Sequence, residues 1–239
     1  MPDNADSTTG SSAVTVVSVG GSIVVPDGVD VAFVSAFAGL MRAYLDADRT
    51  RRLVLVIGGG ATARASQAAA RKLDPNVDSA FLDEIGIAAT RVNAAIVKAA
   101  FADLCSAPVF TDPTTIATDQ SRVIVGGGWK PGFSTDTVAV YAAQAVGAGR
   151  VVNLSNIAMI YTADPRTNPD ARPLQSMSWQ ELFAIVGDDW TPGKNTPFDP
   201  VATRLAASLG MTVIAADGRN LENLEALLAG RRFVGTTIS

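Results

Sequence analysis

Three long apolar runs, each followed directly by glycines, dominate the hydrophobic pattern of the chain. They cover residues 13–19, 53–57 and 122–125, and glycines stand at 20–21, 58–60 and 126–128. Near-continuous apolar runs of this length are typical of strands that are buried on both faces of a parallel sheet. Shorter runs predict further strands at residues 108–111, 150–154 and 211–215.

Segments with apolar residues at helical spacing alternate with these strands. The pattern predicts helices over residues 29–45, 62–73, 84–104, 135–146, 180–186, 200–209 and 221–228. Alternating strands and helices predict an α/β fold, a three-layer sandwich with a mostly parallel central sheet and helices on both faces. Residues 1–12 are small and polar, so we expect a solvated tail there, and we expect loops at 164–174 and 188–200.

Composition narrows the possible functions more than it narrows the fold. The 239 residues, of which 48% are apolar, suffice for one domain or two closely fused lobes, and a net charge of −4 argues against nucleic-acid or anionic-membrane binding. There is no histidine, which excludes Ser-His and Cys-His nucleophile pairs and most zinc enzymes. Phosphoryl transfer suits the remaining residue types, because it depends on positioning and charge neutralisation.

Three features of the sequence indicate where in the cell the protein is located. No apolar run is long enough to span a bilayer, and no signal peptide is visible at the start of the sequence. Cys105 is the single cysteine and cannot form an internal disulfide, which fits a reducing compartment. We therefore expect a cytoplasmic protein.

The glycine turns are the first candidate for chemistry. In an open parallel sheet, ligands bind beyond the carboxyl ends of the strands, and glycines there let several backbone N–H groups approach a phosphate. Each turn alone is also explained as ordinary tight-turn chemistry. Three such turns in one chain predict a site that holds several phosphates.

Two segments add polar groups to these turns. Lys130 adds charge after the third glycine run, and Ser134 or Thr135 can cap the helix that follows, although a plain helix cap with a surface lysine explains the same residues. After the strand at 150–154, Tyr161 could stack on a base and Asp164 could bind a ribose or an amine, or they could be a buried tyrosine and a turn-forming aspartate.

Other nucleotide-binding patterns fit less well. No G-x-x-x-x-G-K-[ST] motif occurs, so the chain is not a P-loop kinase. Gly58, Gly60 and Ala63 do fit G-x-G-x-x-A after a strand, with Asp78 and Asp83 about 20 residues further on, so a dinucleotide-binding oxidoreductase stays available.

Taken together, the motifs resemble uridylate (UMP) kinases of the amino-acid kinase superfamily, of the archaeal type. The resemblance runs from residue 14 to residue 238. It is carried by segments 19–22 (VGGS), 58–64 (GGGATAR), 81–87 (FLDEIGI), 90–93 (TRVN), 127–136 (GGWKPGFSTD), 161–165 (YTADP), 198–202 (FDPVA) and 235–238 (GTTI).

The resemblance implies an amino-acid kinase fold and a complete reaction. The γ-phosphate of ATP moves to UMP to give UDP, with Mg²⁺, in pyrimidine nucleotide biosynthesis. It further implies one domain over residues 13–239, with a UMP-binding N-terminal lobe at about 13–148, an ATP-binding C-terminal lobe at about 149–239, and a homohexamer.

Site residues follow from the same resemblance. The implied ATP-binding residues are Gly21, Ser22, Gly60, Arg64, Ser155, Tyr161 and Asp164. The implied UMP-binding residues are Gly59, Asp83, Trp129, Lys130, Pro131, Gly132, Phe133, Ser134, Thr135 and Asn156. The candidate catalytic residues are Asp199, Lys130 and Arg64, and no metal ligand is identified.

The sequence departs from the family pattern at three places. The family's Gly-His-Thr-Thr-Asp reads GFSTD at residues 132–136, and two further departures concern charged residues. Ser18 stands where many superfamily kinases have a lysine, and Ala158 stands where an aspartate that orients Mg²⁺ is common. Positive charge at the transferred phosphate must then come from Mg²⁺, Arg64, Lys130 or Lys194. We expect Arg91 and Asn93, on a mostly apolar helix, to make helix or subunit contacts rather than substrate contacts.

Three alternatives therefore stay open besides a UMP kinase. One is a kinase of the same superfamily that acts on an amino acid, carbamate or isopentenyl phosphate. The second is a non-catalytic nucleotide-binding or storage protein, which the departures at Ser18 and Ala158 suggest. The third is the dinucleotide oxidoreductase.

Overall fold

The central sheet of the computed structural model joins both halves of the chain. The structure describes residues 13–165, 167–187 and 196–239. The strand order is β3-β2-β1-β4-β8-β9-β7, parallel from β3 to β8, with β9 antiparallel to β8 and parallel to β7. The strands are β1 (Val14–Val19), β2 (Arg52–Ile57), β3 (Val123–Gly126), β4 (Arg150–Ser155), β7 (Ser176–Met177), β8 (Thr212–Asp217) and β9 (Thr236–Ile238).

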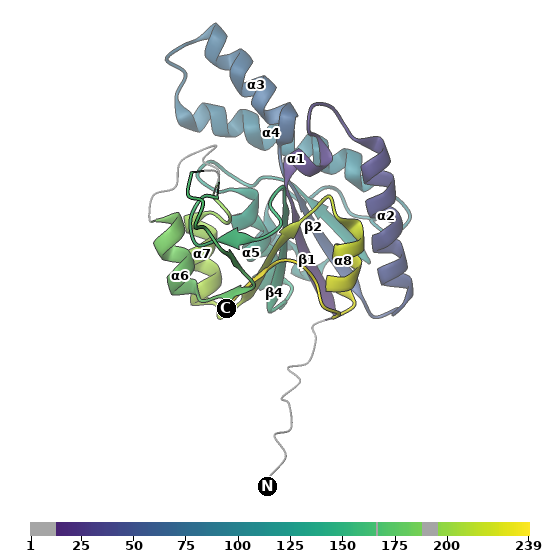
Figure 1. Cartoon of the computed structure of the whole chain (residues 1–239). Helices are drawn as coiled ribbons and strands as arrows, with labels where there is room; N and C mark the ends of the chain where they lie inside the picture. The colour runs from purple at the N-terminus through teal and green to yellow at the C-terminus, as the bar shows by residue number, and fades with distance from the viewer. Residues whose placement is uncertain (1–12, 166, 188–195) are drawn as a thin grey trace.

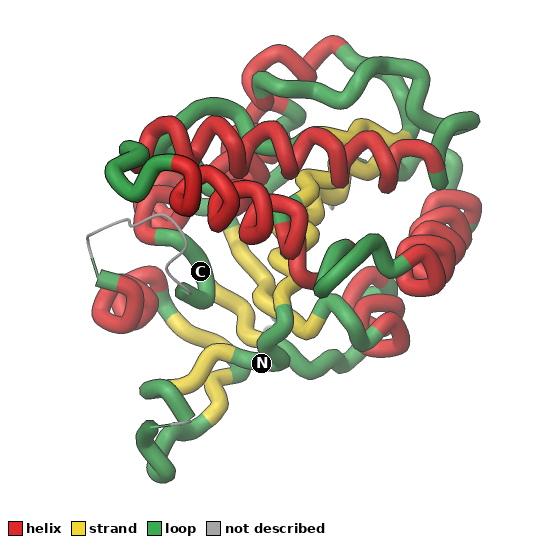
Figure 2. Tube along the Cα trace, turned by 90° about the horizontal axis from the view of Figure 1, so that it is seen from above, coloured by secondary structure: helices red, strands yellow, loops and turns green. Residues whose placement is uncertain are grey.

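Helices cover both faces of this sheet, as Figures 1 and 2 show. They are α1 (Gly21–Val24), α2 (Val31–Asp46), α3 (Gly60–Leu73), α4 (Ser79–Ala99), η1 (Pro113–Thr118), α5 (Thr135–Ala145), α6 (Trp179–Val186), α7 (Pro200–Ser208) and α8 (Leu221–Leu228). One core layer packs α2, α8 and the end of α4 against the sheet, and the other packs α5, α6, α7 and η1. The three-layer α/β sandwich predicted from the sequence is thereby confirmed.

The strand sequences themselves create two cores. Successive side chains of a strand point to opposite faces. On β1, Val17 and Val19 join the α2 layer while Val16 joins the α5 layer, and on β2, Leu55 and Val56 divide in the same way. Burying one such side chain contributes roughly 1.5–3 kcal/mol, so apolar residues on both faces fix these strands in the middle of the sheet.

Two predicted elements differ from the structure. Residues 108–111 are not a strand, because Pro108 has no N–H to donate and only Phe110 bridges to Gly126 at the sheet edge. The helix predicted over 84–104 begins five residues earlier, because the Asp78 side chain accepts a hydrogen bond from Phe81 N at 2.7 Å and caps it. It ends at Ala99, after which the chain turns into the core at the fully buried Phe101.

Two parts of the molecule extend beyond the sandwich. Helix α3 and the first half of α4 form a hairpin that projects above the sheet (Figure 1). Strands β5 (Ile160–Tyr161) and β6 (Pro173–Leu174) pair into a small antiparallel ribbon that extends away from the sandwich (Figure 2). In the described residues, no helix is both long and apolar enough to cross a membrane. The tail predicted at 1–12 and most of the loop predicted at 188–200 lie outside the described residues.

Candidate active site

The three glycine turns meet at one edge of the sheet. β1, β2 and β3 are adjacent and parallel, so their carboxyl ends, and the glycines that follow them, lie side by side. The first two turns touch through their backbones. A Cβ added to Gly21 would lie 2.0 Å from Gly60 N, and one added to Gly58 would lie 2.4 Å from Gly21 N. Only glycine permits this approach, which brings the backbones of the first two turns into contact.

Asn93 on α4 holds the second glycine turn from behind. Its Nδ2 donates hydrogen bonds to Gly58 O and Gly59 O, both at 2.9 Å, and its Oδ1 accepts one from Thr62 Oγ1 at 3.2 Å. Asn93 is completely buried. Of the helix or subunit contacts expected for Asn93, the structure shows contacts within the chain, and they fix two carbonyls of the glycine turn.

Two neighbours of Asn93 hold the third glycine turn in the same way. Thr90 Oγ1 accepts a hydrogen bond from Gly128 N at 2.6 Å. Arg91 donates to Gly128 O at 3.2 Å and to Trp129 O at 3.0 Å. Helix α4 thus positions two glycine turns through the segment at 90–93, a function that the sequence did not reveal because only tertiary packing places the helix against the turns.

We expect Asn93→Ala to lower the free energy of unfolding by about 2 kcal/mol or more and to reduce turnover. The substitution leaves two buried carbonyls without donors, and each such group costs roughly 1–3 kcal/mol. Urea unfolding followed by circular dichroism measures the first effect. Asn76→Ala, in an exposed loop, is the matched control. An unchanged midpoint in Asn93→Ala would contradict the assigned contact.

The loop after the third glycine turn carries aromatic residues and is held to α4 by Asp83. Trp129, Phe133 and Tyr141 form a cluster with ring centroids 5.3–6.0 Å apart. Lys130 Nζ lies 3.9 Å from the centroid of the Trp129 ring, so this cation is held on the aromatic cluster. Asp83, on α4, accepts a hydrogen bond from Gly132 N at 3.0 Å. The structure therefore brings together Asp83 and the loop at 129–135, all of which the resemblance implied for UMP.

Asp199 joins the starts of two helices. It caps α7, because its Oδ1 accepts from Val201 N at 2.7 Å and from Ala202 N at 2.9 Å. Its Oδ2 accepts from Thr137 Oγ1 at 3.0 Å and from Ser134 Oγ, both at the start of α5. A carboxylate has about four lone-pair sites, and four donors occupy them here. In this arrangement Asp199 positions the neighbouring elements and has no free acceptor site.

Asp136 is a second carboxylate beside Asp199, and it was not among the site residues predicted from the sequence. Its Oδ1 accepts a hydrogen bond from Ser18 Oγ at 3.0 Å. Loss of solvent, followed by the charge of Asp199, raises the pKa of Asp136 to about 7. Among the described residues, no lysine or arginine forms an ion pair with either carboxylate. Ser18 thus contributes an uncharged hydroxyl to this pair rather than a cation.

The raised pKa of Asp136 makes stability fall as pH rises. The ordinary pKa is 3.8, so between that value and about 7 the unfolded chain loses this proton while the folded chain keeps it. Each pH unit in this window costs up to about 1.4 kcal/mol, and the full cost is present above pH 7. We expect Asp136→Asn to gain stability relative to the parent between about pH 5 and about pH 8. Urea midpoints at both pH values measure this gain, and equal pH slopes would contradict the shift.

On the other side of the glycine turns lie the residues implied for ATP. Arg64, on α3, donates to Ser22 Oγ at 3.3 Å and to Pro26 O at 2.9 Å, so it lies at the first turn. Ser155 is the last residue of β4, next to β1, and its carbonyl accepts a hydrogen bond from Gly218 N at 2.8 Å. Tyr161 lies on the β5–β6 ribbon, with Asp164 just beyond it. Lys194 lies outside the described residues.

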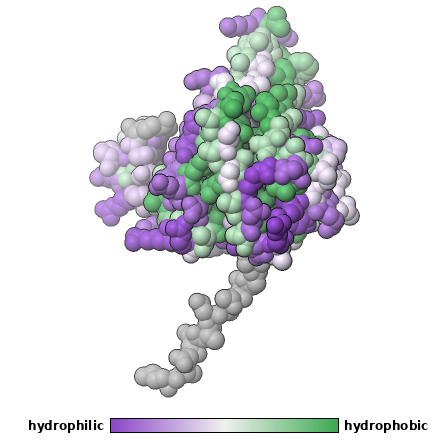
Figure 3. Space-filling model, turned by 90° about the vertical axis from the view of Figure 1, so that its right-hand side faces the viewer, coloured by the Kyte–Doolittle hydropathy of each residue, from purple (hydrophilic) through white to green (hydrophobic). Residues whose placement is uncertain are grey.

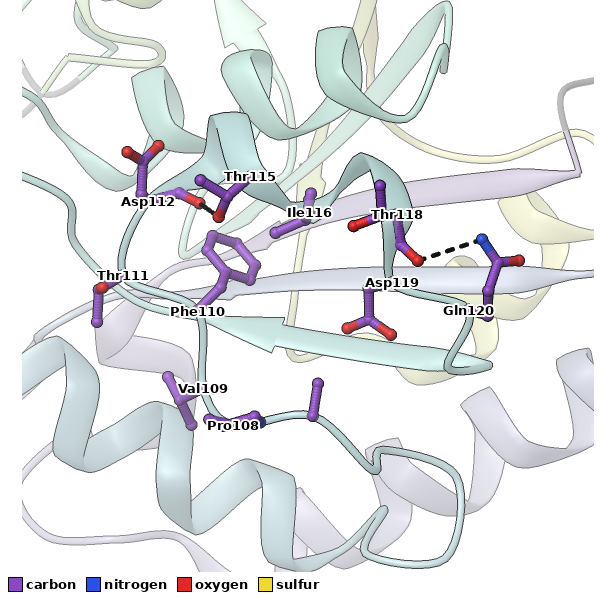
Figure 4. A pocket seen from close by; sticks show the side chains of 11 residues that line it. Pro108, Val109, Phe110, Thr111, Asp112, Thr115, Ile116, Thr118, Asp119 and Gln120 are labelled. Atoms are coloured by element: carbon purple, nitrogen blue, oxygen red, sulfur yellow. Dashed lines mark hydrogen bonds between the residues drawn. The ribbon is translucent and has the colours of Figure 1, made fainter.

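A separate hollow opens at the edge of the sheet beside β3. The segment at 107–120 lines it, including Phe110, Asp112 and Ile116 (Figure 4). The Phe110 ring lies directly over Gly126, where an added Cβ would lie 2.2 Å from a ring carbon. None of the residues implied for UMP or ATP lines this hollow.

Comparisons with known proteins agree with this architecture. The model of the amino acid kinase family matches residues 13–217. The chain belongs to the amino acid kinase family. Within this family it is 35% identical over 227 residues to the uridylate kinase of Methanospirillum hungatei JF-1, and the alignment covers 94% of each chain. It is 32% identical to the uridylate kinase of Pyrococcus abyssi, over 93% of this chain and 98% of that protein.

A solved structure of the amino acid kinase family agrees as well. The crystal structure of uridylate kinase from Archaeoglobus fulgidus is similar with a TM-score of 0.80 and 29% sequence identity, over 95% of this chain and 99% of that chain. The resemblance stated from the sequence motifs and the fold that it implied are both confirmed.

Proposed function

We propose that this protein is a UMP kinase that transfers the γ-phosphate of ATP to UMP and releases UDP and ADP. The observation that carries the proposal is the full-length similarity to uridylate kinases, in which 94% of this chain and of the Methanospirillum protein align. The site agrees with it, because several backbone turns that can hold phosphates lie at one edge of the sheet.

In this proposal, UMP binds on one side of the glycine turns and ATP binds on the other side. Gly59, Asp83, Asn156 and the loop at 129–135 bind UMP, with the Asp83 carboxylate toward the ribose. Gly21, Ser22, Gly60, Arg64, Ser155, Tyr161 and Asp164 bind ATP. The division into an N-terminal lobe for UMP and a C-terminal lobe for ATP is part of this proposal.

The chemistry needs no covalent enzyme intermediate. A phosphate oxygen of UMP attacks the γ-phosphorus of ATP, the bond from that phosphorus to the bridging oxygen breaks, and ADP leaves with the electron pair. Backbone N–H groups of the turns and the Arg64 guanidinium spread the charge that shifts during transfer. Asp199 serves this step by holding Ser134 and Thr137 in position rather than by touching the phosphate.

Mg²⁺, bound with ATP, is the cation that we propose for this reaction. The chemistry of the site fits it at one residue, because the Asp136 carboxylate forms no ion pair with another described residue and Mg²⁺ prefers oxygen ligands. Asp136 is the residue that would hold it, since the four donors around Asp199 leave that carboxylate filled. Mg²⁺ would neutralise phosphate charge there, which the uncharged Ser18 does not do.

An ADP-release assay with a panel of acceptors tests the proposed function. With ATP and Mg²⁺, we expect turnover with UMP and much slower turnover with CMP, dUMP, AMP or isopentenyl phosphate. Turnover with a different acceptor alone would replace the substrate assignment. ATP binding without any turnover would favour the non-catalytic nucleotide-binding protein instead.

Asp83→Asn is expected to weaken UMP binding about tenfold and to leave ATP binding unchanged. The change removes the carboxylate charge that would accept ribose hydroxyls, a loss of about 1.4 kcal/mol, the equivalent of a tenfold change in affinity. Isothermal titration with each nucleotide measures both affinities. Glu222→Gln, on an exposed turn of α8, is the control for loss of one negative charge. Equal weakening of both nucleotides would remove Asp83 from the UMP side.

Two further parts of the proposal concern the cellular compartment and the oligomeric state. We place the protein in the cytoplasm, which its single buried cysteine suits. We also propose a homohexamer, as the family resemblance implies.

A further inference from the structure

Thr236, in the last motif of the chain, is a buried hydroxyl inside the sheet. The GTTI motif at 235–238 carries part of the resemblance, but none of its residues is among the predicted site residues. Its last three residues form β9, which lies between β8 and β7. Thr236 is fully buried there. A buried hydroxyl needs hydrogen-bond partners, and those of Thr236 lie far away in the sequence.

The Thr236 hydroxyl joins the two strands of the β5–β6 ribbon. Its Oγ1 accepts a hydrogen bond from Ile160 N at 2.8 Å and donates one to Leu174 O at 2.5 Å. These partners precede Thr236 by 76 and 62 positions. Ile160 and Leu174 are also paired with each other in the ribbon. One hydroxyl therefore holds the base of both strands against the sheet.

Hydrophobic burial holds only the base of the ribbon. Ile160 is buried in the core layer of α5 and α7, and the half-buried Leu174 packs against the same layer. Among the described residues from 162 to 173, none is buried. The projecting α3–α4 hairpin differs, because Figure 3 shows hydrophobic side chains gathered on it. A two-stranded ribbon is marginally stable by itself, so its contacts at the base decide where the rest of it lies.

The ribbon carries two of the residues proposed for ATP. Tyr161 follows the anchored Ile160 directly, and Asp164 lies three residues further on. Thr162 N donates a hydrogen bond to Arg172 O at 3.0 Å, and Arg172 N donates one to Thr162 Oγ1 at 3.1 Å. Strand pairing thus continues from the base past Tyr161, and a shift of the base would move Tyr161 and Asp164 together.

We propose that Thr236 is a positioning residue for ATP, because its hydroxyl fixes the β5–β6 ribbon and the ribbon sets the place of Tyr161 and Asp164. The inference rests on the proposed function, in which these two residues bind ATP. Thr236 itself acts from inside the sheet through hydrogen bonds to the backbone of the ribbon. Its loss should therefore weaken ATP binding and spare UMP binding.

Isothermal titration of Thr236 variants with each nucleotide tests the proposal. Thr236→Val keeps the shape of the side chain and removes both hydrogen bonds, so ATP affinity should fall about tenfold while UMP affinity stays that of the parent. Thr236→Ser keeps the hydroxyl and should bind ATP as tightly as the parent does. Parent-like ATP affinity in Thr236→Val, or an equal loss for both nucleotides, would overturn the proposal.

Thr237→Val is the matched control. Thr237 is the next residue on β9 and is half-buried, and its hydroxyl forms no hydrogen bond within the described part of the chain. The same chemical change one position away should leave the affinities for both nucleotides unchanged. A loss of ATP affinity in Thr237→Val equal to that in Thr236→Val would assign the effect to β9 as a whole and overturn the role of the Thr236 hydroxyl.

Hydrogen exchange reports on the anchor without any nucleotide. In Thr236→Val, peptides that cover β5 and β6 should exchange about tenfold faster than in the parent, while peptides of α4 keep the parent's rate. If Thr236→Val does not fold, Thr236→Cys gives the same comparison, because a thiol is only a weak donor and acceptor. Unchanged exchange in the ribbon would overturn the proposal.

Acceptor turnover is measured separately. A parent that binds ATP but phosphorylates no acceptor would contradict the proposed function. The ATP affinities of Thr236→Val and Thr236→Ser would still decide the role of Thr236 in that case, because they require no turnover.

Discussion

Gly21→Ala is expected to lower kcat/KM for phosphoryl transfer by about 100-fold or more. The new Cβ would lie 2.0 Å from Gly60 N and 2.6 Å from Gly59 N. Both are backbone atoms, so no side-chain rotation relieves the overlap and one turn must move. A loss of 100-fold corresponds to about 2.7 kcal/mol of transition-state stabilisation, which is within reach when the donors around a phosphate are displaced.

Gly28→Ala is the control for this substitution. No atom lies within 4 Å of a Cβ built there, and the residue has no left-handed backbone angle. Its kcat/KM should equal that of the parent. Steady-state kinetics at varied ATP and UMP, with circular dichroism to verify folding, compare the two variants. A fully active Gly21→Ala would show that the first two turns do not hold phosphates.

Asp199→Ala is expected to lower the free energy of unfolding by about 2–4 kcal/mol and to remove most of the turnover. The helix cap alone contributes about 1 kcal/mol. The Thr137 and Ser134 hydroxyls lose their acceptor as well, and Thr137 is completely buried, which adds roughly 1–3 kcal/mol. Since Ser134 belongs to the loop at 129–135 that we propose for UMP binding, its displacement should disturb substrate binding along with the fold.

Asp199→Asn separates the two effects. The amide oxygen can still accept from Val201 N and Ala202 N, so the cap persists, while the amide nitrogen turns toward the two hydroxyls in place of an oxygen. We expect stability near that of the parent and turnover reduced more than nucleotide affinity. Urea unfolding and steady-state kinetics on both variants give the comparison. Unchanged turnover in Asp199→Asn would limit this aspartate to a structural role.

The local hydrophobic pattern of the sequence was enough to predict much of the fold and the position of the candidate site. The apolar runs of β1 and β2 are buried on both faces of the sheet. The sequence predicts this burial, because successive side chains of a strand enter different layers and most of them are apolar here. The glycine turns follow the strands directly, so parallel pairing alone brings them to one edge. The family also follows from sequence, because its motifs are short local segments in a fixed order.

Local pattern failed where a contact between distant segments decides the outcome. Residues 108–111 have strand-like composition, yet a proline and a single bridge at the sheet edge leave them irregular. The short strands β7 and β9 exist only because they complete the sheet beyond β8. Two or three residues carry no periodicity from which to predict them.

By itself, then, the sequence determined the alternating strands and helices, the glycine turns after the strands and the membership of the amino acid kinase family. Only the tertiary structure placed Asp136 between Ser18 and Asp199, which are separated from it by 118 and 63 positions, and set Thr90, Arg91 and Asn93 against the glycine turns. It also showed that Phe81 and Val92, both on α4, stay outside the core. The physical reason is that periodicity records which side of an element is apolar, whereas pKa values, turn positions and exposed faces depend on the neighbours that folding brings there.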